Sequence, residues 1–313
     1  MFKPLILGLA LAGCTLTLAG CGGSPQPQTG DDTMQADPKF IADEEAWRAR
    51  RDEGLRKPDG WTSLVGLHWI ELKAHFIGSD EGSGIRLAKG PPKLGLLEQD
   101  GERVFFTPEK GVAVTVDDTP VTGRVELHDD TSETPSVLGF DEGKGLVTVI
   151  VRDGRRALRV KHADAETRTQ FAGLEYWPAD PSWKIRGRFV PNPPGKTIPV
   201  ADIIGSINDE PSPGAVEFER DGKTWRIDAL DEGDGNLFLV FADRTNGHGS
   251  YGAGRFLYAD PPDADGNVVI DFNQSYNPPC AFTPFATCPL PPPENRLDLA
   301  VTAGEKKYAG SAH

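Results

Sequence analysis

The side chains with the richest chemistry in this 313-residue chain gather between residues 271 and 295. Acidic, amide and phenol groups there precede two cysteines, Cys280 and Cys288, in a run that is rich in proline. We call residues 276–295 the Cys/Pro-rich loop. Polar and aromatic residues between prolines predict a rigid loop that is pinned to the surface of a strand scaffold, and binding residues lie disproportionately on such loops. The alternative is that these residues have no binding role and only fix the conformation of a long C-terminal loop.

A set of polar residues in and before this stretch could bind a ligand or catalyse a reaction. The candidates are Arg168, Glu175, Asp228, Tyr251, Arg255, Asp271, Asn273, Tyr276 and Asn277. Glu175 and Asp271 could act as a carboxylate pair, which requires a separation of about 5–10 Å. Each residue also has a structural interpretation, such as an ion pair between Arg168 and Glu175 or between Arg255 and Asp271. We favour that interpretation for any single residue, and expect an enzyme only if several converge in one pocket.

Cys280 and Cys288 are separated by seven residues, and this spacing leaves three chemistries open. A disulfide in an oxidising compartment would restrict the unfolded chain by about 2–3 kcal/mol. A zinc site is less favoured, because the two thiols have no obvious further ligands nearby and zinc-binding pairs are usually spaced more closely. A catalytic thiol would need a histidine beside it, and no such arrangement is visible in the sequence.

The usual catalytic and cofactor motifs are missing from the sequence. We find no nucleophile elbow, zinc-protease motif, phosphate-binding loop or dinucleotide fingerprint. Asp263-Ala264-Asp265-Gly266 is similar to part of a calcium loop but lacks the distal glutamate, so we expect a hairpin turn there. The sequence therefore predicts no metal site and leaves any cofactor unknown.

The N-terminus carries the features of an export signal. An apolar run from Leu5 to Gly20 follows Lys3, and its sixteen residues are short for a transmembrane helix, which needs about 20. The run ends in Leu18-Ala19-Gly20-Cys21, which resembles the lipobox of bacterial lipoproteins. That resemblance implies cleavage before Cys21 and acylation of its thiol and amine. A similar tetrapeptide that ends in Cys14 would leave too short an apolar core.

These features predict where the mature chain resides. Residues 1–20 would be a lipoprotein signal peptide, and residues 21–37 the lipidated cysteine with a flexible tether. The lipid anchor would hold the chain at a membrane, and Gly22 after the cysteine implies the outer membrane, with the body facing the periplasm. Only Cys280 and Cys288 would remain as thiols, so an oxidising compartment favours their disulfide.

Composition excludes some partners and architectures. Lys and Arg number 33 against 47 Asp and Glu, a net charge of −14, which disfavours nucleic-acid binding. The chain contains 36 glycines and 27 prolines, and this share favours short strands joined by turns over a helical bundle.

The order of patterns along the mature chain predicts three parts. Residues 38–59 form an amphipathic helix with Phe40, Trp47 and Leu55 on its apolar stripe. Its arginine run, Arg48, Arg50 and Arg51, is interpreted as a solvated face. Residues 60–165 and 166–313 read as two β domains, because short alternating runs are divided by turn residues such as Asp117-Asp118, Asp153-Gly154 and Asp221-Gly222.

We therefore expect a mostly β protein of two packed antiparallel β-sandwich or barrel-like domains. A segment from Phe76 to Asp80, followed by Ile85-Arg86-Leu87, is faintly similar to a forkhead-associated domain. Such domains read phosphothreonine with an arginine after the glycine and a downstream Ser-x-x-His. Ser79 follows Gly78 here, so we do not expect phosphopeptide binding.

Most of the chain from Trp47 to Tyr308 resembles a bacterial and archaeal family catalogued as domain of unknown function 1684. The most specific segment is YNPPCAFTPFATCPLPPPENR, residues 276–296, which spans the Cys/Pro-rich loop. The resemblance implies that this segment is a family hallmark, but it implies no activity. Family members without export signals keep a thiol or metal role open for the cysteines.

Two functions remain open from the sequence. We favour a ligand-binding or envelope-interaction module whose partner is a small molecule, a glycan or an envelope protein. The alternative is a hydrolase-like enzyme with a site between the Cys/Pro-rich loop and the second β domain.

Overall fold

The computed structural model describes residues 37–310, and these residues group into one compact unit. The predicted signal peptide, Cys21 and nearly all of the tether lie outside the described residues. The long helix α1 (Pro38–Arg56) begins after Asp37, whose side chain accepts a hydrogen bond from the Lys39 backbone N–H at 2.9 Å. An aspartate cap followed by proline in the first turn is a favoured helix start. No helix within the described range is long and apolar enough to cross a membrane.

The inward face of α1 is more polar than its sequence pattern predicts. Leu55 is buried as expected, but Glu44 is buried too. Arg48 donates to the Trp177 carbonyl at 3.0 Å, and Arg51 donates to the Asn277 carbonyl at 2.9 Å. The prediction of a solvated arginine face is therefore wrong for Arg48 and Arg51, because their partners lie far along the chain and no local pattern reveals them.

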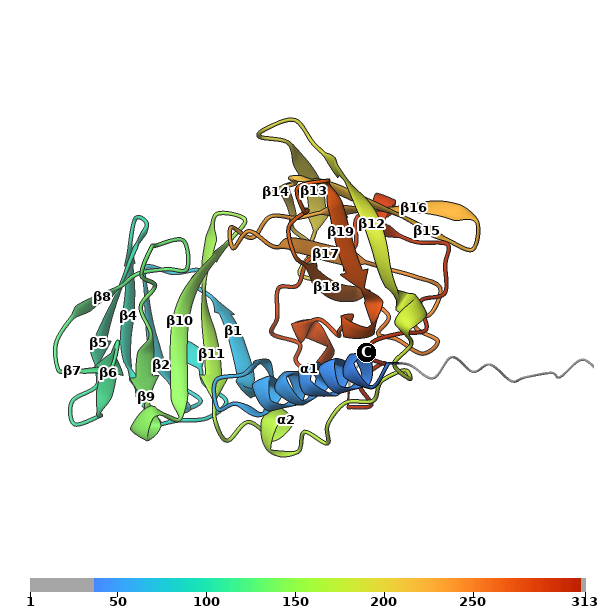
Figure 1. Ribbon diagram of the computed structural model, residues 1–313. Helices are drawn as coiled ribbons and strands as arrows, with labels where there is room; N and C mark the ends of the chain where they lie inside the picture. The colour runs from blue at the N-terminus through green and yellow to red at the C-terminus, as the bar shows by residue number, and fades with distance from the viewer. Residues whose placement is uncertain (1–36, 311–313) are drawn as a thin grey trace, which may run out of the picture. The chain divides into compact units, whose positions relative to one another are not determined.

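The N-terminal β region is a sandwich of two sheets (Figure 1). The six-stranded sheet has the order β1-β11-β10-β9-β6-β7, with β1 (Leu64–Trp69), β11 (Arg155–His162), β10 (Gly145–Arg152), β9 (Leu138–Phe140), β6 (Val114–Val116) and β7 (Thr119–Val121). The five-stranded sheet has the order β3-β2-β4-β5-β8, with β3 (Ile85–Arg86), β2 (Ala74–Gly78), β4 (Gly95–Asp100), β5 (Arg103–Pro108) and β8 (Val125–Leu127). Buried side chains of both sheets, such as Phe106 and Leu158, share one core.

Tight turns hold the strand register as the sequence predicts. At the β10–β11 hairpin, Arg152 pairs with Arg155 across Asp153 and Gly154, whose φ angles are 50° and 68°. Two consecutive positive φ angles define the turn that matches the right-handed twist of a hairpin. The register therefore places Arg152, Arg155 and Arg159 on the same face of the sheet.

The C-terminal region contains a four-stranded sheet and two hairpins, all antiparallel. The sheet has the order β16-β15-β12-β19, with β16 (Lys223–Ala229), β15 (Gly214–Arg220), β12 (Lys184–Pro191) and β19 (Asn267–Asp271). The hairpins are β13 (Thr197–Ala201) with β14 (Ile207–Pro211), and β17 (Leu237–Phe241) with β18 (Arg255–Ala259). Phe218 of the sheet, Phe241 of a hairpin and Phe272 lie in one buried core. The prediction of a mostly β, sandwich-like fold is thus confirmed.

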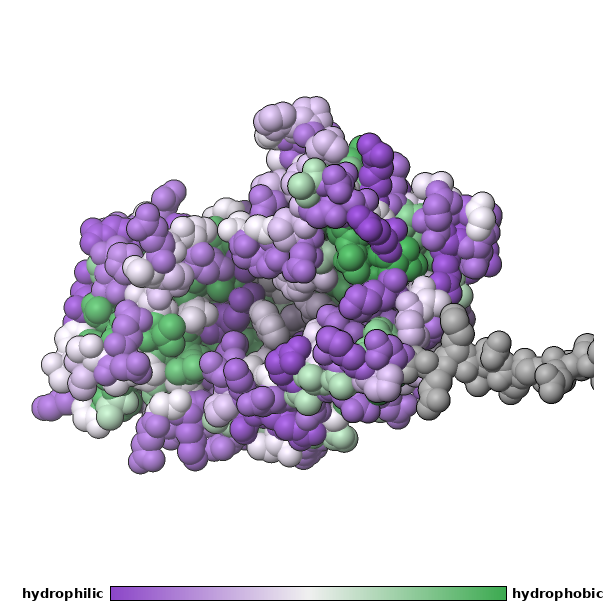
Figure 2. Space-filling model, viewed as in Figure 1, coloured by the Kyte–Doolittle hydropathy of each residue, from purple (hydrophilic) through white to green (hydrophobic). Residues whose placement is uncertain are grey.

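Short helical segments complete the connections. They are α2 (Glu166–Thr169) and the 3-10 turns η1 (Trp61–Ser63), η2 (Asp141–Gly143), η3 (Pro181–Trp183), η4 (Phe272–Gln274), η5 (Pro279–Ala281) and η6 (Pro293–Asn295). The Cys/Pro-rich loop joins the two β regions, because Thr283 donates to the Leu64 carbonyl at 3.1 Å and Cys280 packs in a core that includes Leu64. The face in Figure 2 is mainly hydrophilic, with apolar residues visible between the polar ones.

Candidate functional site

A cavity of about 670 Å³ lies where the Cys/Pro-rich loop meets both β regions. Its lining comes from the β10–β11 hairpin, the β13–β14 hairpin, the β17–β18 hairpin, the loop itself and the C-terminal half of α1. The principal lining residues are Arg51, Trp61, Arg152, Arg159, Asp202, Asn208, Glu210, Asp231, Glu232, Phe238, Phe256, Tyr258, Tyr276, Thr287 and Cys288. Segments far apart in the sequence therefore build one site.

One side of the cavity is basic. Arg51 is paired with Glu305, and Arg152 Nη1 is paired with Asp130 Oδ2 at 2.7 Å. Arg159 differs, because its only side-chain hydrogen bond to a described residue is from Nη2 to Thr287 Oγ1, at 3.3 Å.

Arg159 is also enclosed by groups that do not neutralise it. Its guanidinium lies 5.4 Å from the centre of the Trp61 ring, and its Nε has no partner among the described residues. Burial and the nearby Arg152 lower the pKa of Arg159, which remains charged because a guanidinium does not deprotonate in proteins. The charge of Asp130 opposes this shift, but Asp130 is paired with Arg152, so no carboxylate among the described residues forms an ion pair with Arg159.

Another side of the cavity is acidic. Its carboxylates follow or belong to the β13–β14 hairpin and the segment after β16, and they are Asp202, Glu210, Asp231 and Glu232. Asp202 is only 6% exposed, and its Oδ1 accepts the backbone N–H groups of Ile204 at 3.1 Å and Ser206 at 2.9 Å. Its Oδ2 has no hydrogen-bond partner within the described part of the chain.

Aromatic rings line the space between these charged sides. Tyr258 and Tyr276 stack with ring centres 6.3 Å apart, and the Arg51 guanidinium lies 4.6 Å from the Tyr276 ring centre. Tyr258 donates its hydroxyl proton to Glu232. Burial raises the pKa of both phenols, so each keeps its proton at neutral pH. Such flat surfaces suit an apolar or aromatic part of a ligand.

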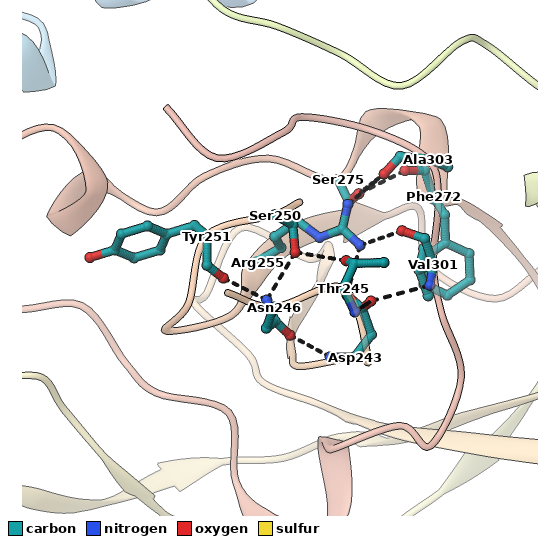
Figure 3. A network of polar contacts seen from close by, with 10 residues as sticks. All are labelled: Asp243, Thr245, Asn246, Ser250, Tyr251, Arg255, Phe272, Ser275, Val301 and Ala303. Atoms are coloured by element: carbon teal, nitrogen blue, oxygen red, sulfur yellow. Dashed lines mark hydrogen bonds and ion pairs between the residues drawn. The ribbon is translucent and has the colours of Figure 1, made fainter. Parts of the chain in front are cut away.

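Tyr276 and Cys288 line this cavity, whereas Arg255 lies in a buried polar network. Arg255 is fully buried, and its Nη2 donates to Asp243 Oδ2 at 2.7 Å and to the Val301 carbonyl at 2.8 Å (Figure 3). Its guanidinium therefore holds the C-terminal segment against β18. The predicted structural pairing with Asp271 is wrong, because Asp271 pairs with Lys184 at 3.2 Å.

Asp271 and Asn273 fix the backbone at the end of β19. The Asp271 side chain accepts the Asn273 backbone N–H at 3.1 Å and so caps η4. The Asn273 amide accepts the Asp180 N–H at 3.0 Å and donates to the Asp180 carbonyl at 2.9 Å. These contacts position loop backbone, and neither side chain lines the cavity.

Three further candidates, Arg168, Asn277 and Glu175, lie outside the cavity. Arg168 donates to the Arg56 carbonyl at 2.9 Å and so satisfies the last turn of α1. The Asn277 side chain donates to the Lys306 carbonyl at 2.8 Å. The Glu175 side chain is exposed and forms no ion pair with Arg168 in the described structure.

Asp228 and Tyr251 also have structural contacts. Asp228 accepts from Arg226 at 2.9 Å. Tyr251 is buried and donates its hydroxyl to the Cys280 carbonyl at 3.2 Å. The convergence of polar candidates that the enzyme alternative requires is therefore not found, since only Tyr276 of that set lines the cavity.

Cys280 and Cys288 are adjacent, buried, free thiols. The Cys280 backbone N–H donates to Cys288 Sγ at 3.2 Å, and a hydrogen bond between the thiols lowers the pKa of Cys280. The predicted disulfide is not present in the structure, although the two side chains are in contact. No cluster of three or more potential metal ligands occurs between residues 37 and 310.

Sequence reasoning missed the basic and acidic residues of the cavity. Arg159 sits in an alternating strand and Asp202 at the end of another, where charged residues usually face solvent. Neither has a motif around it, so only the meeting of the two β regions reveals them. The available signal was indirect, namely the prediction that the Cys/Pro-rich loop is pinned to a strand scaffold.

Comparison with protein families identifies the part of the chain that supplies the loop and the acidic side. Residues 169–306 match the model of a family described as a protein of unknown function, DUF1684. This part of the chain is therefore similar to that family, and we call residues 169–306 the DUF1684 domain. This domain contributes Asp202, Tyr276 and Cys288 to the cavity, whereas Arg159 and Trp61 precede it.

Solved structures give two weaker similarities. An uncharacterized protein of Haloarcula marismortui is 30% identical, over 46% of this chain and 80% of that one, with a TM-score of 0.38. The N-terminal FHA domain of EssC, a component of the bacterial type VII secretion apparatus, is 12% identical, over 31% of this chain and 46% of that one, with a TM-score of 0.25. No curated protein matches the chain.

Proposed function

We propose that this protein binds a small molecule in the cavity between the Cys/Pro-rich loop and the two β regions, as a lipid-anchored protein of the cell envelope. The observation that carries the binding role is the cavity itself, at about 670 Å³. Ligand pockets in proteins commonly measure about 300–1,000 Å³ and combine apolar walls with a few polar groups. Tyr258, Tyr276 and Arg159 provide such a combination here.

Binding is favoured over hydrolysis because the candidate catalytic residues are engaged elsewhere. Asp271 caps a turn and Arg255 is enclosed in an ion pair. Glu175 is exposed outside the cavity. A hydrolase with these residues as acid, base and oxyanion group would need them together around one reacting atom.

A thermal-shift screen of the full chain with envelope metabolites and glycans tests the binding role. A ligand at 100 times its dissociation constant adds about 2.7 kcal/mol to the free energy of unfolding. The variant Asn208→Trp fills the cavity from β14, and Asp209→Trp places the same ring on the exposed face of that strand. We expect ligand shifts to vanish in Asn208→Trp and persist in Asp209→Trp. Equal shifts in both variants, or none in the wild type, would contradict cavity binding.

The anchoring role rests on the N-terminal sequence. The apolar run and the Leu-Ala-Gly-Cys tetrapeptide support acylation at Cys21 and residence at the outer membrane, facing the periplasm. Metabolic labelling with a fatty-acid analogue should mark the wild type and Cys14→Ala but not Cys21→Ala. Label retained in Cys21→Ala would exclude this anchor.

A further inference from the structure

The basic and the acidic residues around the cavity come from different parts of the fold. The basic residues Arg51, Arg152 and Arg159 belong to α1, β10 and β11. The acidic residues Asp202 and Glu210 come with the β13–β14 hairpin of the DUF1684 domain. The acidic residue on the basic side, Asp153, lies exposed in the β10–β11 turn. The cavity therefore has a basic side and an acidic side, and we call it bipolar. Its charge is more balanced than that of the chain, which has a net charge of −14.

Within this bipolar cavity, Arg159 is half-buried and Asp202 is buried, and neither forms an ion pair among the described residues. Glu210, Asp231 and Glu232 form no ion pair there either, but they are partly or fully exposed to solvent. Arg159 has no carboxylate within ion-pair distance in the described structure, unlike its neighbour Arg152. Asp202 uses one carboxylate oxygen for two backbone N–H groups and has no ion pair among the described residues. Enclosed charges are unfavourable unless they are compensated, so each residue favours an occupant of opposite charge.

Arg159 and Asp202 also do not compensate each other. Both line the same cavity, yet no ion pair joins them in the described structure. An occupant that carries only one charge would leave the other residue uncompensated, and a neutral glycan would leave both. An occupant with a negative and a positive end matches both residues at once.

We propose that the ligand is a zwitterion of amino-acid or short-peptide size, whose anionic group binds Arg159, whose ammonium group binds Asp202 and whose apolar part packs on the cavity aromatics. This rests on the proposed binding function and specifies its ligand class. A guanidinium suits the anionic group because its planar donors match a carboxylate in geometry. Trp61 and Tyr258 offer apolar surface of the kind that a hydrophobic side chain requires.

The experiment compares ligands of three lengths, each in forms that differ in the charge of their termini. Phenylalanine, glycyl-phenylalanine and glycyl-glycyl-phenylalanine cover three separations between the ammonium and the carboxylate. Each is titrated calorimetrically into the full chain in mild detergent in four forms: free, N-acetylated, C-amidated and doubly capped. We expect at least one free form to bind, and each cap to weaken it about tenfold or more, because a charge-assisted hydrogen bond is lost.

Variants then assign each charge to its residue. In Arg159→Gln the free and amidated forms should bind equally, whereas Arg159→Lys should restore part of the preference. In Asp202→Asn the free and acetylated forms should bind equally. Arg155→Gln and Asp209→Asn are matched controls, because both residues are exposed on the same structural elements and lie outside the cavity. Both controls should keep the wild-type preferences.

The outcomes separate this inference from the proposed function. If the doubly capped form binds as well as the free form, or if the variants leave the preferences unchanged, the zwitterion assignment is wrong. If no peptide form binds while another compound shifts the wild type but not Asn208→Trp, cavity binding stands and the zwitterion is excluded. If no compound of any class binds, both proposals fail.

Discussion

Arg51 Nε donates to Glu305 Oε1 at 2.8 Å and so joins α1 to a segment 254 residues later in the chain. The Glu305 side chain is fully buried, and its other oxygen accepts the Asn277 backbone N–H at 2.7 Å. The same Arg51 guanidinium donates to the Asn277 carbonyl and covers Tyr276 at the cavity. This ion pair therefore fixes α1, the start of the Cys/Pro-rich loop and the C-terminal segment together.

Removal of the arginine should destabilise the protein strongly. Arg51→Gln leaves the Glu305 carboxylate buried without a cation, which typically costs about 3–5 kcal/mol. Denaturant unfolding of the full chain should show a loss of about 3 kcal/mol, and Arg50→Gln, at an exposed position of the same helix, should change little. Equal stability of the two variants would show that the Arg51–Glu305 pair does not hold α1.

Glu44 predicts a specific pH dependence. It is buried on α1, and burial and the nearby Asp271 raise its pKa, while a hydrogen bond from Gln274 and the charge of Lys184 oppose this effect. Glu44 Oε2 has no hydrogen-bond partner in the described region, and a proton on Glu44 could be shared with Asp271, whose Oδ2 also lies 3.2 Å from the Lys184 ammonium. The folded protein therefore holds this proton more tightly than the unfolded chain does.

The sign of the effect follows from that difference. Glutamate in the unfolded chain titrates near pH 4.3, so the contribution of Glu44 is greatest below that pH and declines as the pH rises through its raised folded pKa. Glu44→Gln does not titrate and keeps a donor for Asp271. The stability of the wild type relative to Glu44→Gln should thus fall between pH 4 and neutrality, measured by denaturant unfolding. Glu45→Gln, an exposed neighbour, should show no such trend, and a relative stability that rises with pH would refute the shared proton.

Asn295 anchors the proline run to the C-terminal sheet and hairpin. It is fully buried, accepts the Asp228 N–H at 2.7 Å, and donates to the carbonyls of Asp228 and Val240, both at 2.9 Å. Asn295→Ala would leave three backbone groups without partners, and each such group costs about 1–3 kcal/mol. Thermal and denaturant unfolding should show a loss of about 3 kcal/mol or more. Glu294→Gln, on the exposed neighbour, serves as the control, and a small effect at Asn295 would mean that water replaces the amide.

Local chemistry made much of this fold predictable. The Asp153-Gly154 turn specifies a hairpin because few residue pairs tolerate positive φ at both positions. The Cys/Pro-rich loop was predicted to be pinned to strands, and Thr283 and Asn295 provide those pins. Turn type and loop rigidity depend on neighbouring residues, so the sequence contains the information for them.

Long-range pairing explains what the sequence did not reveal. Arg48 and Arg51 have the spacing of an exposed helix face, and only partners more than a hundred residues away bury them. Arg255 was considered for the site because it lies in a specific family-like segment, whereas its environment is a closed ion pair with Asp243. The charges of the cavity remained hidden for the same reason, because Arg159 and Asp202 belong to different β regions.

The last prediction concerns the two cysteines of the Cys/Pro-rich loop, whose redox state should depend on whether the chain is exported. Cys280 and Cys288 are free in the structure but close enough for a backbone N–H of one to contact the sulfur of the other. If the chain resides in the oxidising envelope, the thiols should be joined there, and closing the nine-residue loop from Cys280 to Cys288 would stabilise the protein by about 2–3 kcal/mol. Full chain isolated from the envelope should be alkylated in denaturant before and after reduction, and analysed by mass spectrometry.

We expect Cys280 and Cys288 to be alkylated only after reduction, and the reduced protein to unfold at a lower denaturant concentration. The variant Cys280→Ser should leave Cys288 open to alkylation without reduction, which verifies that denaturant exposes this buried position. Because the two thiols are already in contact, oxidation requires only a small adjustment of the loop, so ligand binding should survive it. Free thiols at both positions in envelope-derived wild type would show that the pair is kept as a dithiol, and a thiol role at the cavity wall, where Cys288 lies, would then take precedence over a structural bond.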